Sequence, residues 1–129
     1  MTDISQAYRP NIIGDRINPG FKSTLALLEA GDVAGMQALA VRQVEAGATA
    51  LDFTIGPRAR EQPEVLAEWI RVVQAAVSVP LCFDYLDIPV LEVCLKSYDQ
   101  DRALGRPPII NSLAETRWEM MSLYELRPF

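Results

Sequence analysis

The sequence predicts an α/β fold in which four short strands form a parallel sheet and a helix follows each strand. The central strand is the best defined, because the apolar residues after Pro80 end abruptly at Asp84, as in a strand buried on both faces. Helical patterns separate the predicted strands and are long enough for right-handed crossovers. These features predict the order β-α-β-α-β-α-β-α and a single domain over residues 1–129.

Two strands and two helices are expected in the first half of the chain. Residues 11–14 form the first strand, and the polar run after them is expected to be a loop. Gly31 closes a short helix over residues 22–30, and Asp32 is placed to cap the next helix. The apolar face of that second helix is Val33, Met36, Ala40 and Val44. Residues 48–53 form the second strand.

The second half of the chain continues the same alternation. After a polar segment at residues 58–62, Pro63 is well placed in the first turn of the most clearly amphipathic helix. The apolar positions of this helix are Leu66, Trp69, Ile70, Val73 and Val77. Asp87 caps the helix that follows the central strand. The apolar face of that helix carries Leu91, Cys94, Leu95 and Tyr98. Residues 109–111 form the fourth strand, and residues 115–126 form the last helix.

Two architectures accommodate this order of elements. One is a doubly wound sheet with helices on both faces, and the other is half of a TIM-type (β/α)8 barrel, with helices on one face only. A doubly wound signalling receiver matches in length and in having Asp84 at a strand end. A receiver would also need an acidic pair after the first strand and a lysine at a fifth strand, and the sequence does not provide them.

Composition and charge exclude several classes of function. The net charge is −5 and there are only two lysines, which argues against nucleic acid or an anionic membrane as the main partner. No apolar run is long enough for a membrane span and the N-terminus has no signal pattern, so we expect a cytoplasmic protein. The sequence has no histidine, which excludes Ser-His and Cys-His pairs and makes a metal site unexpected. Cys82 and Cys94 are expected to be buried thiols.

Polar side chains lie at the ends of all four predicted strands. They are Asn18, Thr54, Asp84 and Asn111. Because the carboxyl ends of parallel strands meet at one rim, we expect a ring of hydrogen-bonding groups around a flat polar ligand. Asp84 is the first candidate, although a carboxylate at this point also fits a turn or a helix cap. The segment around Gly56 is too short to be a glycine-rich phosphate loop.

Four segments of the chain follow the order and spacing of a known family. They are Ile13-Gly14-Asp15-Arg16-Ile17-Asn18, residues 43–52, Pro80-Leu81-Cys82-Phe83-Asp84 and Ile109-Ile110-Asn111-Ser112. Together they resemble the pterin-binding methyltransferases, which include methyltetrahydrofolate:corrinoid protein methyltransferases and the folate domain of cobalamin-dependent methionine synthase. Dihydropteroate synthases are more distant relatives. The resemblance spans almost the whole chain but only the first half of the family's barrel, so residues 1–129 are interpreted as the N-terminal half of a pterin-binding domain.

The resemblance implies a site and a reaction. Members of this family are (β/α)8 barrels that bind a reduced pterin at the carboxyl end of the sheet and pass its methyl group to a corrinoid on another protein. Methyltetrahydrofolate is therefore the implied ligand and a corrinoid protein the implied partner. Asp84 and Asn111 are implied as the catalytic pair that hydrogen-bonds the pterin ring. The other implied pterin-binding residues are Asn18, Asp52, Thr54 and Gly56.

The chain departs from the family's pattern at three positions. Asp15 stands where Glu is usual, Thr54 where Asn is usual and Tyr85 where Ser is usual. The family's later strands also supply another pterin-binding Asp and the Asn nearest N5, and the four segments matched here do not include them. We therefore weigh two functions. One is methyl transfer from methyltetrahydrofolate to a corrinoid protein, and the other is a non-catalytic pterin-binding or assembly module.

A half-barrel also predicts an interface. Strand residues such as Leu81, Cys82 and Phe83 are apolar on both faces, whereas helices would cover only the outer face. Exposed apolar surface on the inner face and two open edge strands would mark an interface or an aggregation hazard. The sequence therefore predicts a homodimer, or a complex with a chain that supplies the second half, in preference to a folded monomer.

Overall fold

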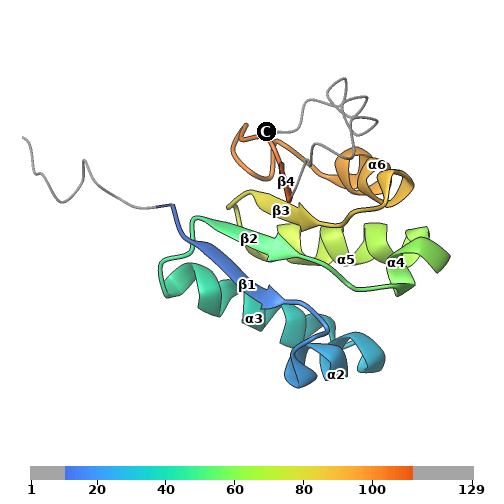
Figure 1. The fold of residues 1–129 in the computed structure, drawn as a ribbon. Coiled ribbons are helices and arrows are strands. Elements are labelled where there is room, and N and C mark those ends of the chain that lie inside the picture. Colours follow the sequence, from blue (N-terminus) through green and yellow to red (C-terminus); the bar gives the residue numbers. More distant parts are fainter. Residues whose placement is uncertain (1–10, 112–129) are drawn as a thin grey trace, which may run out of the picture.

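The computed structural model describes residues 11–111, which form a four-stranded parallel sheet in the spatial order β1-β2-β3-β4 (Figure 1). The strands are β1 (Ile13–Ile17), β2 (Ala50–Phe53), β3 (Leu81–Asp84) and β4 (Ile109–Asn111). The predicted α/β fold with βα units and a parallel sheet is confirmed.

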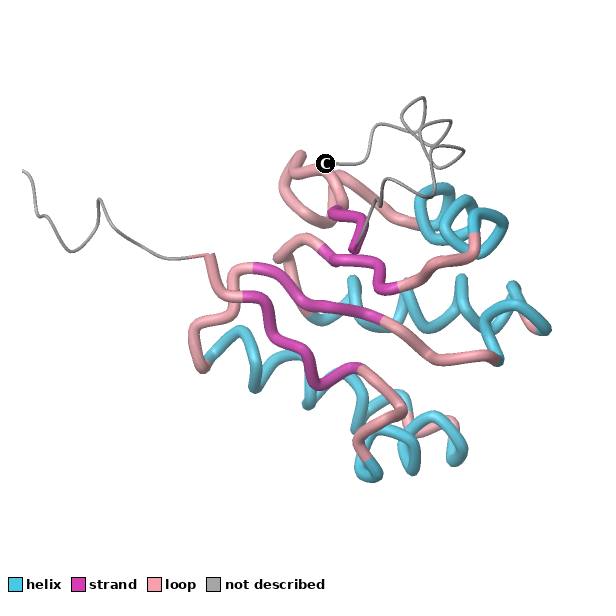
Figure 2. The backbone as a smooth tube through the Cα atoms, in the orientation of Figure 1, coloured by secondary structure: helices cyan, strands magenta, loops and turns pink. Residues whose placement is uncertain are grey.

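The helices connect the strands and lie on one side of the sheet (Figures 1 and 2). They are α2 (Lys22–Ala30), α3 (Val33–Glu45), α4 (Arg58–Glu61), α5 (Pro63–Ala76) and α6 (Ile88–Ser97). Each strand pairs with the next one along the chain, so successive right-handed crossovers place their helices on the same face. A doubly wound sheet requires the strand order to reverse, and no reversal occurs among these four strands. The arrangement is that of part of a TIM-type barrel.

The predicted helix boundaries rest on local hydrogen bonds that the structure contains. The carboxylate of Asp32 accepts a hydrogen bond from the Gly35 amide at 2.9 Å, and that of Asp87 accepts one from the Val90 amide at 3.3 Å. Gly31 has φ 62°, the left-handed conformation expected of a residue that ends a helix. None of the helices in the described part of the chain is both long and apolar enough to cross a membrane.

The structure differs from the sequence predictions at two elements, and a third predicted element lies outside the described residues. β1 does not end at residue 14 but runs to Ile17, because the strand continues through a bulge and Ile17 is buried beside Phe53. The polar segment after Pro57 contains a helix, α4, that has too few residues to show an amphipathic period. The helix predicted over residues 115–126 lies outside the described residues.

The core lies between the sheet and the helices, and the inner face of the sheet is more polar than the sequence predicts. Leu81 and Phe83 both point to the helical side and are fully buried, and the Phe83 ring packs edge-on against Phe53 with centroids 6.1 Å apart. The alternate residues Cys82 and Asp84 face the other way. Of the two alternating sets, Cys82 and Asp84 therefore face the inner side, whereas Leu81 and Phe83 belong to the core.

Candidate functional site

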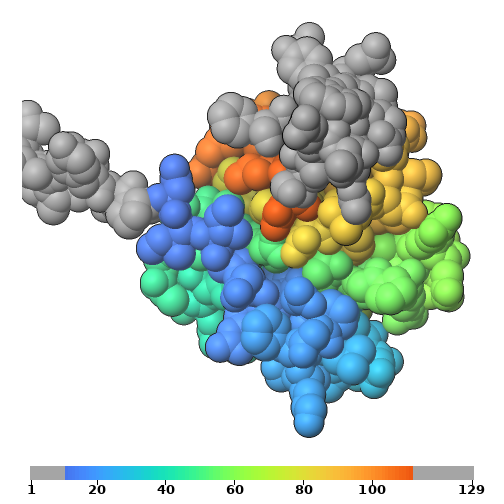
Figure 3. Space-filling view, in the orientation of Figure 1, coloured from blue at the N-terminus to red at the C-terminus, as the bar shows by residue number. Residues whose placement is uncertain are grey.

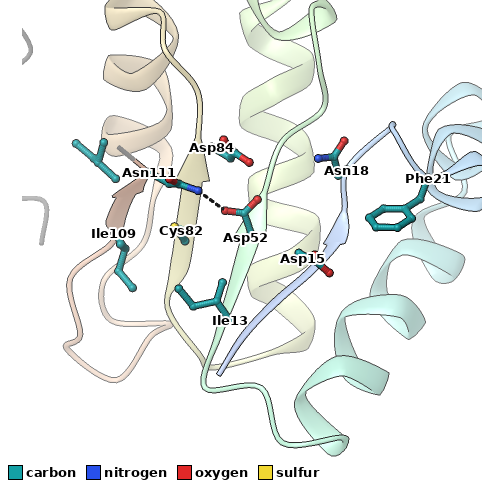
Figure 4. Close-up of a pocket in the computed structure, with 10 residues that line it drawn as sticks. Ile13, Asp15, Asn18, Phe21, Asp52, Cys82, Asp84, Ile109 and Asn111 are labelled. Carbon is teal, nitrogen blue, oxygen red and sulfur yellow. Dashed lines mark hydrogen bonds between the residues drawn. The ribbon is translucent and has the colours of Figure 1, made fainter. Parts of the chain in front are cut away.

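The inner face of the sheet carries a hollow of about 610 Å³ toward the carboxyl ends of the strands (Figure 4). The residues that line it are Ile13, Asp15, Asn18, Phe21, Asp52, Cys82, Asp84, Ile109, Ile110 and Asn111. They come from all four strands and from the loop after β1, so segments far apart in the sequence meet here. The space-filling view shows the same convergence, with the blue, green and yellow parts of the chain in contact (Figure 3). None of the described residues lining the hollow is positively charged.

The polar centre of the hollow is built on three adjacent strands. The registers place Asp52 beside Cys82 and Asp84 beside Asn111. The amide nitrogen Nδ2 of Asn111 donates a hydrogen bond of 3.4 Å to Oδ1 of Asp52, reaching from β4 to β2 across the inner face of β3 (Figure 4). Asp52 is only 6% exposed, although it carries an ionisable carboxyl group. A buried carboxyl group of this kind must be paired or protonated.

Burial and a neighbouring carboxylate raise the pKa of Asp52 to about 6. Loss of hydration is the largest cause, and a hydrogen bond and charge repulsion from Asp84 raise the pKa further. The hydrogen bonds from Asn111 and Cys82 act in the opposite direction, because they stabilise the ionised form. Asp52, beside Asp84, thus holds its proton at mildly acidic pH.

The Cys82 thiol contributes no nucleophile to this site. Burial raises its pKa to about 12, and the negative charges of Asp52 and Asp84 raise it as well. A thiol with this pKa stays protonated at neutral pH, and the thiolate is the reactive form. Cys82 instead acts as a weak hydrogen-bond donor to Asp52. Cys94, the other cysteine, is buried in the core and is not bonded to Cys82.

Four of the six predicted site residues line the hollow. They are Asn18, Asp52, Asp84 and Asn111. Asn18 also shapes the loop after β1, because its side-chain oxygen accepts a hydrogen bond from the Gly20 amide at 2.8 Å.

Thr54 and Gly56 line a separate hollow of about 610 Å³ at the rim, between the segments after β2 and β3, and Asp84 borders both hollows. The Thr54 hydroxyl accepts a hydrogen bond from the Gly56 amide at 3.0 Å, and Gly56 has φ 78°. The Tyr85 hydroxyl accepts a hydrogen bond from the Ile55 amide at 2.7 Å. These residues therefore hold the loop after β2 in place, and the Tyr85 ring lies beside the rim hollow instead of in the inner one.

One acidic and one aromatic residue of the inner hollow are not among the site residues predicted from the sequence. The sequence predicts a loop at Asp15, whereas this residue lies in β1 with its side chain on the inner face (Figure 4). The two-residue spacing of Ile13 and Asp15, which places both on one face of a strand, is the signal that could have found it. Phe21 offers a flat apolar surface at the β1 side, and the Arg16 guanidinium lies 4.7 Å from the centre of its ring. No sequence pattern marks Phe21, because only the turn after Asn18 brings it to the hollow.

The described residues contain no group of three or more His, Cys, Asp or Glu side chains arranged to hold a metal ion. The site instead offers carboxyl and amide groups in a partly enclosed hollow with an aromatic ring at one side. Such a set suits a flat ligand that presents N–H donors.

The chain is similar to the methylcorrinoid:tetrahydrofolate methyltransferase of Eubacterium limosum, with 30% identity over 103 residues. The similarity covers 80% of this chain and 36% of that enzyme, so the chain spans about a third of the length of this curated relative. No protein-family model matches the chain. The similarity confirms the resemblance to corrinoid- and folate-dependent methyltransferases that the four sequence segments indicate.

Proposed function

We propose that this chain forms part of a reduced-pterin site in a methyltransferase that moves a methyl group between tetrahydrofolate and a corrinoid protein. The observation that carries the proposal is the gathering of Asp84 and Asn111 with Asp52 at the carboxyl end of the sheet. Similarity to a methyltransferase named for corrinoid and tetrahydrofolate supports the choice of ligand. In this proposal the corrinoid belongs to a partner protein.

The chemistry of the hollow suits the pyrimidine edge of a pterin. That edge presents N–H donors beside a carbonyl acceptor, and a carboxyl group next to an amide can satisfy both. Asp84 would accept from the N–H donors, and Asn111 would supply its amide group beside it. Phe21 would provide apolar contact for the flat ring.

Methyl transfer also requires control of a proton. A methyl group leaves N5 of methyltetrahydrofolate without its bonding electrons, and N5 then needs a proton or a hydrogen bond to stabilise the departing amine. In the opposite direction, the lone pair of N5 attacks the methyl group, and the methylated N5 then releases its proton. The relative's name states transfer from methylcorrinoid to tetrahydrofolate, so both directions are to be tested.

The alternative is a pterin-binding or assembly module without transfer activity. The specific observation that favours it is the short extent of the match, since the matched region corresponds to only 36% of the relative's length. Residues from the rest of a barrel would then be needed for chemistry, even if the pyrimidine edge binds to this chain.

Calorimetric titration with tetrahydrofolate tests the binding part of the proposal. We expect weak binding by the parent chain and a loss of about tenfold or more for Asp84→Ala, because losing a hydrogen bond to a charged group costs about 1.5–3 kcal/mol. Asp101→Asn is the control, since it removes the charge of an exposed carboxylate outside the hollow. Equal affinity of the parent and Asp84→Ala, or no binding by the parent, would contradict the assignment.

Methyl transfer is followed separately, by the visible spectrum of free cobalamin mixed with the parent chain. Starting from methyltetrahydrofolate and cob(I)alamin tests one direction, and starting from methylcobalamin and tetrahydrofolate tests the other. Binding without transfer in either direction would favour the module over the enzyme.

A further inference from the structure

Asp52 occupies a position between the two residues assigned to the ligand. It is nearly buried, it accepts the hydrogen bond from Asn111 Nδ2, and it lies in the same hollow as Asp84. Asn111 itself is exposed, at the end of a three-residue strand. Without a partner, its amide could present either the nitrogen or the oxygen to a ligand, since the two ends of the group are nearly equal in shape.

We propose that Asp52 is a positioning residue that binds the amide nitrogen of Asn111 and thereby leaves the carbonyl oxygen of Asn111 to face the N–H donors of a ligand. This inference rests on the proposed function only for the identity of the ligand. A carboxyl group is suited to this task because it accepts hydrogen bonds in both protonation states, so the nitrogen of Asn111 is the group it selects.

The same contact links the site to pH. The titratable groups that share the hollow with Asp52 are Asp15 on β1 and Cys82 and Asp84 on β3, whereas Asn111 on β4 is neutral. When Asp52 is protonated, its hydroxyl adds a donor to the hollow beside Asp84. When Asp52 ionises, that donor is lost and Asp52 becomes a further acceptor for N–H groups. Affinity for a donor-rich edge should therefore rise as the pH is raised through about 6.

The first test needs no ligand. The side-chain amide resonances of Asn111 are followed by nitrogen–proton correlation spectra of the full chain from about pH 5 to 8. We expect them to shift with a midpoint near 6 in the parent and in Asp101→Asn, and to stay constant in Asp52→Asn. The side-chain amide of Gln37, which donates to the Val72 carbonyl outside the hollow, is an internal reference. Constant Asn111 resonances in the parent, or an unchanged midpoint in Asp52→Asn, would overturn the inference.

The second test measures tetrahydrofolate affinity over the same pH range. An asparagine at position 52 can still accept from Asn111 and donate to Asp84, so Asp52→Asn should lose the pH dependence while it retains binding. Asp52→Ala removes the acceptor and should weaken binding about tenfold at neutral pH. If Asp52→Asn and Asp52→Ala weaken binding equally, the loss of affinity does not come from a changed orientation of the Asn111 amide. If the parent binds no tetrahydrofolate but the Asn111 amide titrates as expected, the proposed ligand fails and the positioning role stands.

Discussion

The side chain of Asn111 donates its amide hydrogen to the carboxylate of Asp52 over a distance of 3.4 Å, although the two residues lie on strands that are not neighbours in the sheet. Strand β3 lies between them and presents Cys82 and Asp84 to the same face. The contact joins residues 59 positions apart in the chain and places a buried carboxyl group at the centre of the site.

The first prediction concerns stability and pH. Burial raises the pKa of Asp52 from 3.8 to about 6, so the folded chain binds a proton more tightly than the unfolded chain does. The contribution of Asp52 to the free energy of unfolding is therefore most favourable below about pH 4 and falls as the pH is raised to about 6 and above. The difference is up to about 3 kcal/mol, from a shift of about two pKa units at about 1.4 kcal/mol each.

Urea unfolding of the parent and of Asp52→Asn at several pH values measures this contribution of Asp52 to the free energy of unfolding. Asp52→Asn should gain stability relative to the parent as the pH increases from about 4 to 7, because the asparagine has no proton to lose. Asp101→Asn should show no such trend. If the free energies of unfolding of the parent and of Asp52→Asn change in parallel with pH, burial of the Asp52 carboxyl group has no net cost in stability.

The second prediction concerns β1, which brings Asp15 to the site. A Cβ atom at Gly14 would lie 2.5 Å from Oε1 of Gln43, the atom that accepts the hydrogen bond from the Arg16 amide at 3.1 Å. Gly14→Ala should therefore displace Gln43, leave the Arg16 amide without its acceptor, and destabilise the fold by about 1–3 kcal/mol.

A double-mutant cycle separates this clash from other effects of the added methyl group. In the Gln43→Ala background the acceptor is already absent, so Gly14→Ala should cost much less than it does in the parent. The free energies of unfolding of the parent, both single variants and the double variant decide the question. Additive costs would mean that Gln43 does not transmit the effect of the substitution.

The third prediction concerns assembly. The edges of β1 and β4 have no neighbouring strand among the described residues, and no described helix covers the inner face. We expect these edges to pair with a further set of strands, either from a second copy or from a chain that supplies the second half of a barrel. A second copy that shared the cavity would bring its own Asp15, Asp52 and Asp84 to it, and like charges in a shared cavity repel. We therefore expect a second-half chain to be favoured over the homodimer.

Sedimentation over a concentration series, together with the near-ultraviolet circular dichroism of Trp69, tests this expectation. An isolated chain should be a loosely packed monomer or a weak dimer that dissociates as the pH rises above about 6 and Asp52 ionises. A compact monomer that unfolds cooperatively at micromolar concentration would contradict the need for a partner.

The sequence by itself determined the elements, because their signals are local. Asp32, Asp87 and Gly31 mark helix ends through hydrogen bonds within one turn, and Pro63 marks one because it needs no N–H partner in a first turn. The apolar periods assign the core faces. It also identified Asp84 and Asn111 as strand-end residues, since each closes its strand. The bulge that extends β1 was missed, because the Gln43 side chain that bonds the Arg16 amide comes from another element.

Only the tertiary structure decided how the elements are arranged and what the site contains. Whether helices cover one face of the sheet or both depends on the strand order. The strand order in turn depends on pairing between segments that are remote in sequence. The central role of Asp52 has the same origin. Its position in the sequence is that of an ordinary strand residue, and its raised pKa arises from burial and from Asp84 on the neighbouring strand, with Asn111 reaching it from the strand beyond. Such interactions follow from distances in space, which no local pattern of residues records.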